Sequence, residues 1–118
     1  MVLKENERII LNKLNNFFLA DILKETTYEY ARYDAYNKNY IVEIKHMGKF
    51  YDGALIEFDK FSYNLIYAKI TNKQFIYAVR MEYKIYIFNI TKLYKSNYNF
   101  NWTWRDMPIT TNFNSDKR

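Results

Sequence analysis

An apolar segment with two charges inside it places the strongest constraint on the fold of this chain. The segment, Tyr40 to Met47, contains Glu43 and Lys45 among residues that favour β-strands. Because strand side chains alternate between two faces, Glu43 and Lys45 share one face of this strand, and Val42 and Ile44 point to the other. Burying a charge is costly unless it is paired or binds a metal. The segment therefore predicts a largely buried strand whose charges have a function.

A second carboxylate precedes this strand at a spacing that suits a hairpin. Eight residues separate Asp34 from Glu43, and Asn37-Lys38-Asn39 between them is typical of a turn. Such a turn brings the two carboxylates within one rung of each other, where opposed side chains lie about 5 Å apart. Mg²⁺ prefers hard oxygen ligands of this kind and usually keeps several waters. We therefore expect Asp34 and Glu43 to bind one divalent metal ion.

Lys45 completes a set that suits the hydrolysis of phosphodiesters. This reaction needs charge neutralisation at the phosphate, a positioned nucleophile and help for the leaving oxygen, and a divalent metal supplies much of each. From the face of Glu43, Lys45 can contact the scissile phosphate and orient or help to deprotonate the attacking water. The alternative interpretation of Asp34, Glu43 and Lys45 is a cross-strand salt bridge on an exposed sheet face.

A second acid-x-Lys triplet shows that this spacing alone is weak evidence for an active site. An acid-x-Lys triplet is expected by chance about once in a chain with this many acidic residues and lysines. Glu82-Tyr83-Lys84 falls in the predicted turn between two strands and has no Asp on a preceding partner strand. We interpret it as a solvated hairpin tip and predict the site at Glu43-Ile44-Lys45.

The remaining pattern predicts a single domain, 1–118, of mixed α/β architecture. Apolar spacing of three and four predicts helices over about 4–24 and 55–71. The predicted strands are Tyr28–Asp34, Tyr40–Met47, Gln74–Met81 and Lys84–Ile90, with a loop at Gly48–Gly53. This order, α-β-β-α-β-β, predicts a mixed sheet flanked by helices, with a right-handed parallel crossover. The core spans about 4–92, and the tail, 93–118, is predicted to be mostly loop.

Composition limits the other classes of function. The chain has no cysteine and one histidine, His46, which disfavours zinc fingers, HNH nucleases and hydrolases that depend on several histidines. The first residues are too charged for a signal peptide and no apolar run reaches membrane-spanning length, so we expect a cytoplasmic protein, with a phage gene in a host cell as one origin. The net charge of +5 favours a polyanionic partner. Trp102 and Trp104 are expected to cap the core, stack on unpaired bases or pack across a dimer interface.

Over about residues 5–90 the sequence resembles the PD-(D/E)xK nuclease superfamily, through Asp34 on one strand and Glu43-Ile44-Lys45 on the next. Tyr33 stands where the superfamily has its proline. The resemblance implies a restriction-endonuclease-like fold and a Mg²⁺-dependent DNA endonuclease in which Mn²⁺ can substitute. It further implies that Asp34, Glu43 and the Ile44 carbonyl bind the metal and that Lys45 serves the nucleophile. Many members also use an acid on the first helix, for which Glu7 matches best, ahead of Glu5 and Glu25.

A narrower resemblance concerns small phage-type endonucleases and Holliday-junction resolvases. It rests on the segments Tyr33–Tyr36, Val42–Lys45 and Leu55–Phe61, and the absence of a separate recognition domain favours branched, nicked or junction DNA as substrate. We expect a homodimer, because one small domain spans few base pairs and two sites are needed to cut two strands. Lys49 and Lys60 are the candidate phosphate contacts, although a solvated helical lysine is the favoured interpretation of Lys60. The alternatives are a non-catalytic nucleic-acid-binding or interaction protein on the nuclease scaffold and a mobile-element nuclease.

Overall fold

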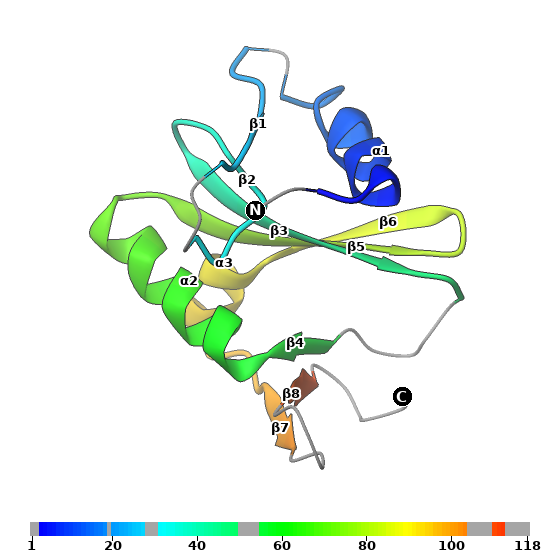
Figure 1. The fold of residues 1–118 in the computed structure, drawn as a ribbon. Coiled ribbons are helices and arrows are strands. Elements are labelled where there is room, and N and C mark those ends of the chain that lie inside the picture. Colours follow the sequence, from blue (N-terminus) through cyan, green and yellow to red (C-terminus); the bar gives the residue numbers. More distant parts are fainter. Residues whose placement is uncertain (1–2, 19, 28–30, 50–54, 104–109, 113–118) are drawn as a thin grey trace.

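A five-stranded mixed sheet forms the centre of the computed structural model (Figure 1). The structure describes residues 3–18, 20–27, 31–49, 55–103 and 110–112. The elements in chain order are α1 (Glu5–Leu14), β1 (Lys24–Glu25), β2 (Ala35–Tyr36), β3 (Tyr40–Met47), β4 (Leu55–Glu57), α2 (Phe58–Ile70), β5 (Gln74–Met81), β6 (Lys84–Asn89), α3 (Ile90–Lys95), β7 (Asn101–Thr103) and β8 (Thr110–Asn112). The central sheet has the order β1-β2-β3-β5-β6, and β4, β8 and β7 form a second, small sheet.

The predicted strand Tyr40–Met47 is confirmed as β3, which has the longest pairing in the central sheet. It pairs in parallel with β5 along its whole length, and α2 lies in the connection between them, as the crossover prediction requires. On its other side β3 pairs antiparallel with β2, but only through Val42 and Ile41. From Glu43 onward β3 therefore has no strand neighbour on that side within the described part of the chain.

The two long helices cover opposite faces of the sheet (Figure 1). Val42 of β3 packs in one cluster with Leu14 of α1, and Ile41 packs in another with Phe61 of α2. Because side chains alternate along a strand, the odd-numbered residues of β3 face α2. Glu43 and Lys45 thus point toward α2.

The first helix is shorter than the predicted range 4–24. It ends at Leu14, and the side-chain amide of Asn15 forms two hydrogen bonds with the backbone of Leu23, one donated by Nδ2 (3.2 Å) and one accepted by Oδ1 (2.7 Å). Asn side chains that satisfy backbone groups offer the chain an alternative to helix. The prediction was wrong because the apolar spacing continues through Phe18 to Ile22, which is exposed.

The first strand of the predicted hairpin is also displaced. The prediction covered Tyr28–Asp34, of which residues 28–30 lie outside the described residues and 31–34 are not a strand. Instead the short β2, Ala35–Tyr36, pairs with β3, and β1 pairs with β2 at the edge of the sheet. The Asn37 side chain closes the turn, because its Oδ1 accepts the backbone N–H groups of Asn39 (2.9 Å) and Tyr40 (2.8 Å). The antiparallel hairpin itself is confirmed.

Two later boundaries differ as well. The helix predicted over 55–71 begins at Phe58, because Leu55–Glu57 pair with β8 as β4. The helix α3 begins at Ile90, the last residue of the predicted strand, and extends into the tail that was predicted to be mostly loop; the Asn89 side chain accepts the Lys92 N–H at 3.0 Å and caps this helix. Trp102 lies in β7, but Trp104 and most of the loop 48–53 lie outside the described residues.

The hairpin tip at Glu82-Tyr83-Lys84 is confirmed. Tyr83 is 88% exposed, and the left-handed backbone of Glu82 (φ 55°) makes the tight turn between β5 and β6. Within the described residues, none of the helices combines the length and the apolar character that crossing a membrane requires.

Candidate active site

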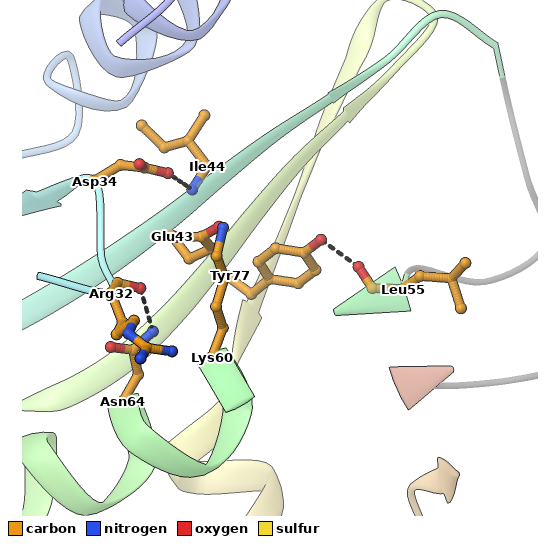
Figure 2. A network of polar contacts seen from close by, with 8 residues as sticks. All are labelled: Arg32, Asp34, Glu43, Ile44, Leu55, Lys60, Asn64 and Tyr77. Carbon is orange, nitrogen blue, oxygen red and sulfur yellow. Dashed lines mark hydrogen bonds and ion pairs between the residues drawn. The ribbon is translucent and has the colours of Figure 1, made fainter. Parts of the chain in front are cut away.

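Asp34 immediately precedes β2, where the chain arrives at the edge of β3. Its N–H donates to the Val42 carbonyl (2.8 Å), although the register partner of Val42 is Ala35. Two successive residues thus face one residue of β3, which is the arrangement of a β-bulge and commonly redirects a side chain. The Asp34 carboxylate Oδ2 accepts the backbone N–H of Ile44 at 2.7 Å (Figure 2). A carboxylate therefore takes the place of the missing neighbouring strand at this point of β3.

Glu43 extends from the same stretch of β3 toward α2. Its Oε2 accepts a hydrogen bond from Nζ of Lys60, in the first turn of α2, at 2.8 Å (Figure 2). Its Oε1 is buried and has no hydrogen-bond partner among the described residues. Asp34 and Glu43 are only 7% and 5% exposed, so the site holds two buried carboxylates, and Lys60 bonds to the second of them.

Burial and mutual repulsion govern the ionisation of the two carboxyl groups. Burial raises the pKa of Glu43 to about 8, the negative charge of Asp34 adds to this effect, and Lys60 opposes it. Burial likewise raises the pKa of Asp34, against the hydrogen bond from Ile44 and the charge of Lys60. Burial works to lower the pKa of Lys60, but the Glu43 carboxylate outweighs it and raises that pKa. The charge of Lys60 thus does not bring either carboxyl pKa back to its ordinary value. A further positive charge would lower both pKa values.

The Ile44 carbonyl faces the same edge of β3 as Asp34. The N–H and C=O of one strand residue point to the same side, and the N–H of Ile44 points to Asp34. Lys45 follows on the face of Glu43, half-buried and opposite Val79 of β5. The structure therefore brings together Asp34, Glu43, the Ile44 backbone and Lys45 along a stretch of β3 that has no second strand neighbour among the described residues.

The predicted acid of the first helix lies near this stretch but comes from the opposite face of the sheet. Glu7 Oε1 accepts the N–H of Lys4 at 2.9 Å at the start of α1, and the charge of Glu7 contributes to the raised pKa of Asp34. Glu5 is exposed. Glu25 is engaged elsewhere, because its carboxylate pairs with Arg8 at 3.1 Å. Of the three helix-acid candidates, Glu7 is thus the one whose charge acts on Asp34.

The donor atoms of this stretch are of the chemical type that Mg²⁺ binds. Within the described residues no cluster of three or more His, Cys, Asp or Glu side chains forms a metal site. Two carboxylates and one backbone carbonyl still provide hard oxygen donors, and Mg²⁺ commonly completes its shell with water. The buried Oε1 of Glu43, which lacks a partner in the described part of the chain, is an open acceptor for such an ion. The residues therefore fit a divalent cation.

Sequence reasoning missed two residues that hold this site in place. Asn64, fully buried on α2, donates Nδ2 to the Arg32 carbonyl at 2.7 Å and ties the segment before Asp34 to the helix (Figure 2). Tyr77 of β5, the register partner of Glu43, donates its hydroxyl to the Leu55 carbonyl of β4.

The pairing of Lys60 with Glu43 was missed too. Its sequence signal is weak: Lys60 and Asn64 are four residues apart and so share one face of α2. A four-residue spacing shows that two side chains point the same way, but it does not reveal the strand that they meet. Lys49, the other predicted phosphate contact, lies exposed just beyond β3.

No protein-family model and no curated protein matches this sequence. Among solved structures the chain is similar to Hjc, a Holliday junction resolvase from the archaeal hyperthermophile Archaeoglobus fulgidus. The TM-score is 0.60 over 90% of this chain and 85% of that chain, at 11% sequence identity. At this identity the similarity is evidence of fold. It confirms the predicted fold class, a nuclease-like mixed α/β sheet flanked by helices.

Proposed function

We propose that this chain is a Mg²⁺-dependent DNA endonuclease of the PD-(D/E)xK superfamily that cuts branched, nicked or junction DNA. The observation that carries the proposal is the meeting of two buried carboxylates, Asp34 and Glu43, beside Lys45, at an edge of β3 that no strand pairs with in the described part of the chain. Burying two acidic side chains together is costly, and binding a metal ion for hydrolysis is one way to offset that cost. The similarity to a Holliday junction resolvase supports the same class of substrate.

The proposed roles follow from the chemistry of each group. Asp34, Glu43 and the Ile44 carbonyl hold Mg²⁺, or Mn²⁺ in its place. The bound ion neutralises charge on the phosphate and lowers the pKa of a water. Lys45 orients that water and helps to deprotonate it. Lys60, beside Glu43, and Lys49, beyond the end of β3, contact phosphates of the DNA backbone.

Cleavage of defined DNA tests this function. Plasmid, linear duplex and four-way-junction DNA are incubated with the protein in Mg²⁺, Mn²⁺ or EDTA. We expect cleavage in either metal, fastest on the junction, and none in EDTA. Cleavage in EDTA would exclude the proposed role of the metal. Binding of all three DNAs without cleavage would instead favour the alternative, a non-catalytic DNA-binding protein on the nuclease scaffold.

The role of the helix acid has a test of its own. Glu7 supplies a second contact to the metal or its water, so we expect Glu7→Gln to slow cleavage about tenfold, the usual cost of removing an outer partner of a metal site. Glutamine can still accept the Lys4 N–H, so the start of α1 should be preserved. Glu5→Gln is the matched control and should keep the wild-type rate at saturating Mg²⁺. Equal rates for the two variants would remove Glu7 from the site.

We also propose that the enzyme is a homodimer. Large apolar side chains are exposed on α2 and α3: Ile70 is 76% exposed, and the exposed side chains of Ile66 and Tyr94 line one cavity between the two helices. Exposed apolar patches of this type are common at protein–protein interfaces. In sedimentation experiments we expect a dimer for the wild type and a monomer for Ile70→Glu, with Tyr83→Glu as the dimeric control. A monomeric wild type would contradict the proposal.

A further inference from the structure

A small cavity lies directly beside Asp34. Its described lining residues are Thr26, Thr27, Tyr33 and Tyr36, and its volume is about 170 Å³. The rings of Tyr33 and Tyr36 are 6.4 Å apart and nearly perpendicular, at 79°. The backbone joins the cavity to the site, because the Thr26 N–H donates to the Asp34 carbonyl at 2.9 Å and Tyr33 immediately precedes Asp34. A ligand in this cavity would therefore lie next to the proposed metal site.

The aromatic wall of the cavity is held rigidly by α2. Tyr33 stacks on Tyr67 of α2, with ring centres 5.5 Å apart, and Tyr67 stacks on Tyr63 at 5.9 Å. The Lys73 ammonium lies 5.4 Å from the centre of the Tyr36 ring. The wall is thus prearranged before any ligand binds, with a cation beside it, which keeps the ordering cost of binding low.

One polar group of the cavity lining is left without a partner. Thr26 is 2% exposed, and its hydroxyl has no hydrogen-bond partner in the described part of the chain. Buried hydroxyl groups are normally hydrogen-bonded, so an unpartnered one calls for a water or a ligand.

The chemistry of the cavity matches one class of ligand. Unpaired nucleobases stack on tyrosine rings, and hydroxyl groups and nearby cations suit their polar edges and phosphates. A cavity of about 150 Å³ is known to hold benzene, so this volume suits a single pyrimidine ring. We propose that the cavity formed by Thr26, Thr27, Tyr33 and Tyr36 binds an unpaired pyrimidine base of the DNA substrate. This proposal rests on the proposed function and adds to it the part of branched DNA that the protein recognises.

Binding of a short single strand tests the proposal without requiring cleavage. We measure the affinity for fluorescein-labelled dT8 in EDTA by anisotropy. We expect Tyr36→Ala and the bulkier Tyr36→Leu to weaken binding about tenfold, within the range found for the loss of one base–aromatic stack. Tyr83→Ala, which removes an exposed tyrosine at the β5–β6 tip, is the matched control and should bind as the wild type does.

Two further measurements separate recognition from folding. Thr26→Val removes the unpartnered hydroxyl, so it should leave thermal stability unchanged or higher while it weakens dT8 binding. An abasic octamer should bind the wild type about tenfold more weakly than dT8, and Tyr36→Ala should no longer distinguish the two strands. Equal binding of both strands by the wild type, or no binding of dT8 at all, would contradict the proposal that the cavity binds a pyrimidine base. Junction cleavage would still decide the nuclease function separately.

Discussion

Glu43→Gln is expected to abolish DNA cleavage while leaving the protein at least as stable as the wild type. The amide has the shape of the carboxylate but cannot supply its charge to a metal, and removing one preorganised stabiliser of transition-state charge costs about 10³-fold in rate. Stability should not fall, because burial already raises the pKa of Glu43 to about 8 and so disfavours its charged form. Rates on four-way-junction DNA and thermal unfolding in EDTA measure the two effects.

Matched variants show whether the loss is specific to the site. Asp34→Asn and Lys45→Ala should lose cleavage as well but keep DNA affinity within about tenfold, or roughly 1.4 kcal/mol, because the other lysines and arginines still contact phosphates. Glu82→Gln, in the second acid-x-Lys triplet at the hairpin tip, should cleave at the wild-type rate. Undiminished cleavage by Asp34→Asn or Glu43→Gln would move the activity elsewhere in the chain.

The metal-free protein is expected to lose stability as the pH rises from about 5 to 8, and Mg²⁺ is expected to restore it. The pKa of Glu43 is about 8 in the folded state, against an ordinary value of 4.5. Between these values the folded state binds more protons than the unfolded state, so the free energy of unfolding falls with rising pH, by up to about 1.4 kcal/mol per pH unit. The raised pKa of Asp34 acts in the same direction.

Metal binding should show the opposite dependence. Mg²⁺ needs the ionised carboxylates, so its binding releases protons and strengthens as the pH approaches 8. Urea unfolding at pH 5 and pH 8, in EDTA and in excess Mg²⁺, measures both trends. Glu43→Gln is the control, because it should flatten the dependence on pH in EDTA and weaken the effect of Mg²⁺. A wild-type curve in EDTA that rises from pH 5 to pH 8 would contradict the expected ionisation.

Elements of the fold that are set by neighbouring residues in the sequence could be predicted. The range of β3 and its hairpin partnership follow from side-chain alternation and from an Asn-rich turn, and both are confirmed. The end of α1 could not be predicted, because it depends on Asn15 meeting the backbone of Leu23 after the chain has reversed. The strand β4 escaped notice because its three residues continue the apolar spacing of α2 and acquire a strand partner only in β8.

The residues of the candidate site also fall into those that could be predicted from the sequence and those that could not. Asp34 and Glu43 could be located from the sequence because a hairpin fixes which residues face each other. The contacts of Lys60 and Asn64 could not, because α2 reaches β3 and the Arg32 segment only through its tertiary position. Whether Asp34, Glu43, Lys45 and Glu7 act in catalysis stays a prediction.

The hydrogen bond between Asp34 and Ile44 also bears on the solubility of the chain. An unpaired strand edge can recruit a strand of another molecule and so begin aggregation. Asp34 immediately precedes β2, and its carboxyl group accepts the Ile44 N–H at that edge of β3. The side chain proposed to bind the metal thus also discourages association between sheets. An inactive variant intended for crystallisation should accordingly carry Asn at position 34, which retains the acceptor, instead of Ala.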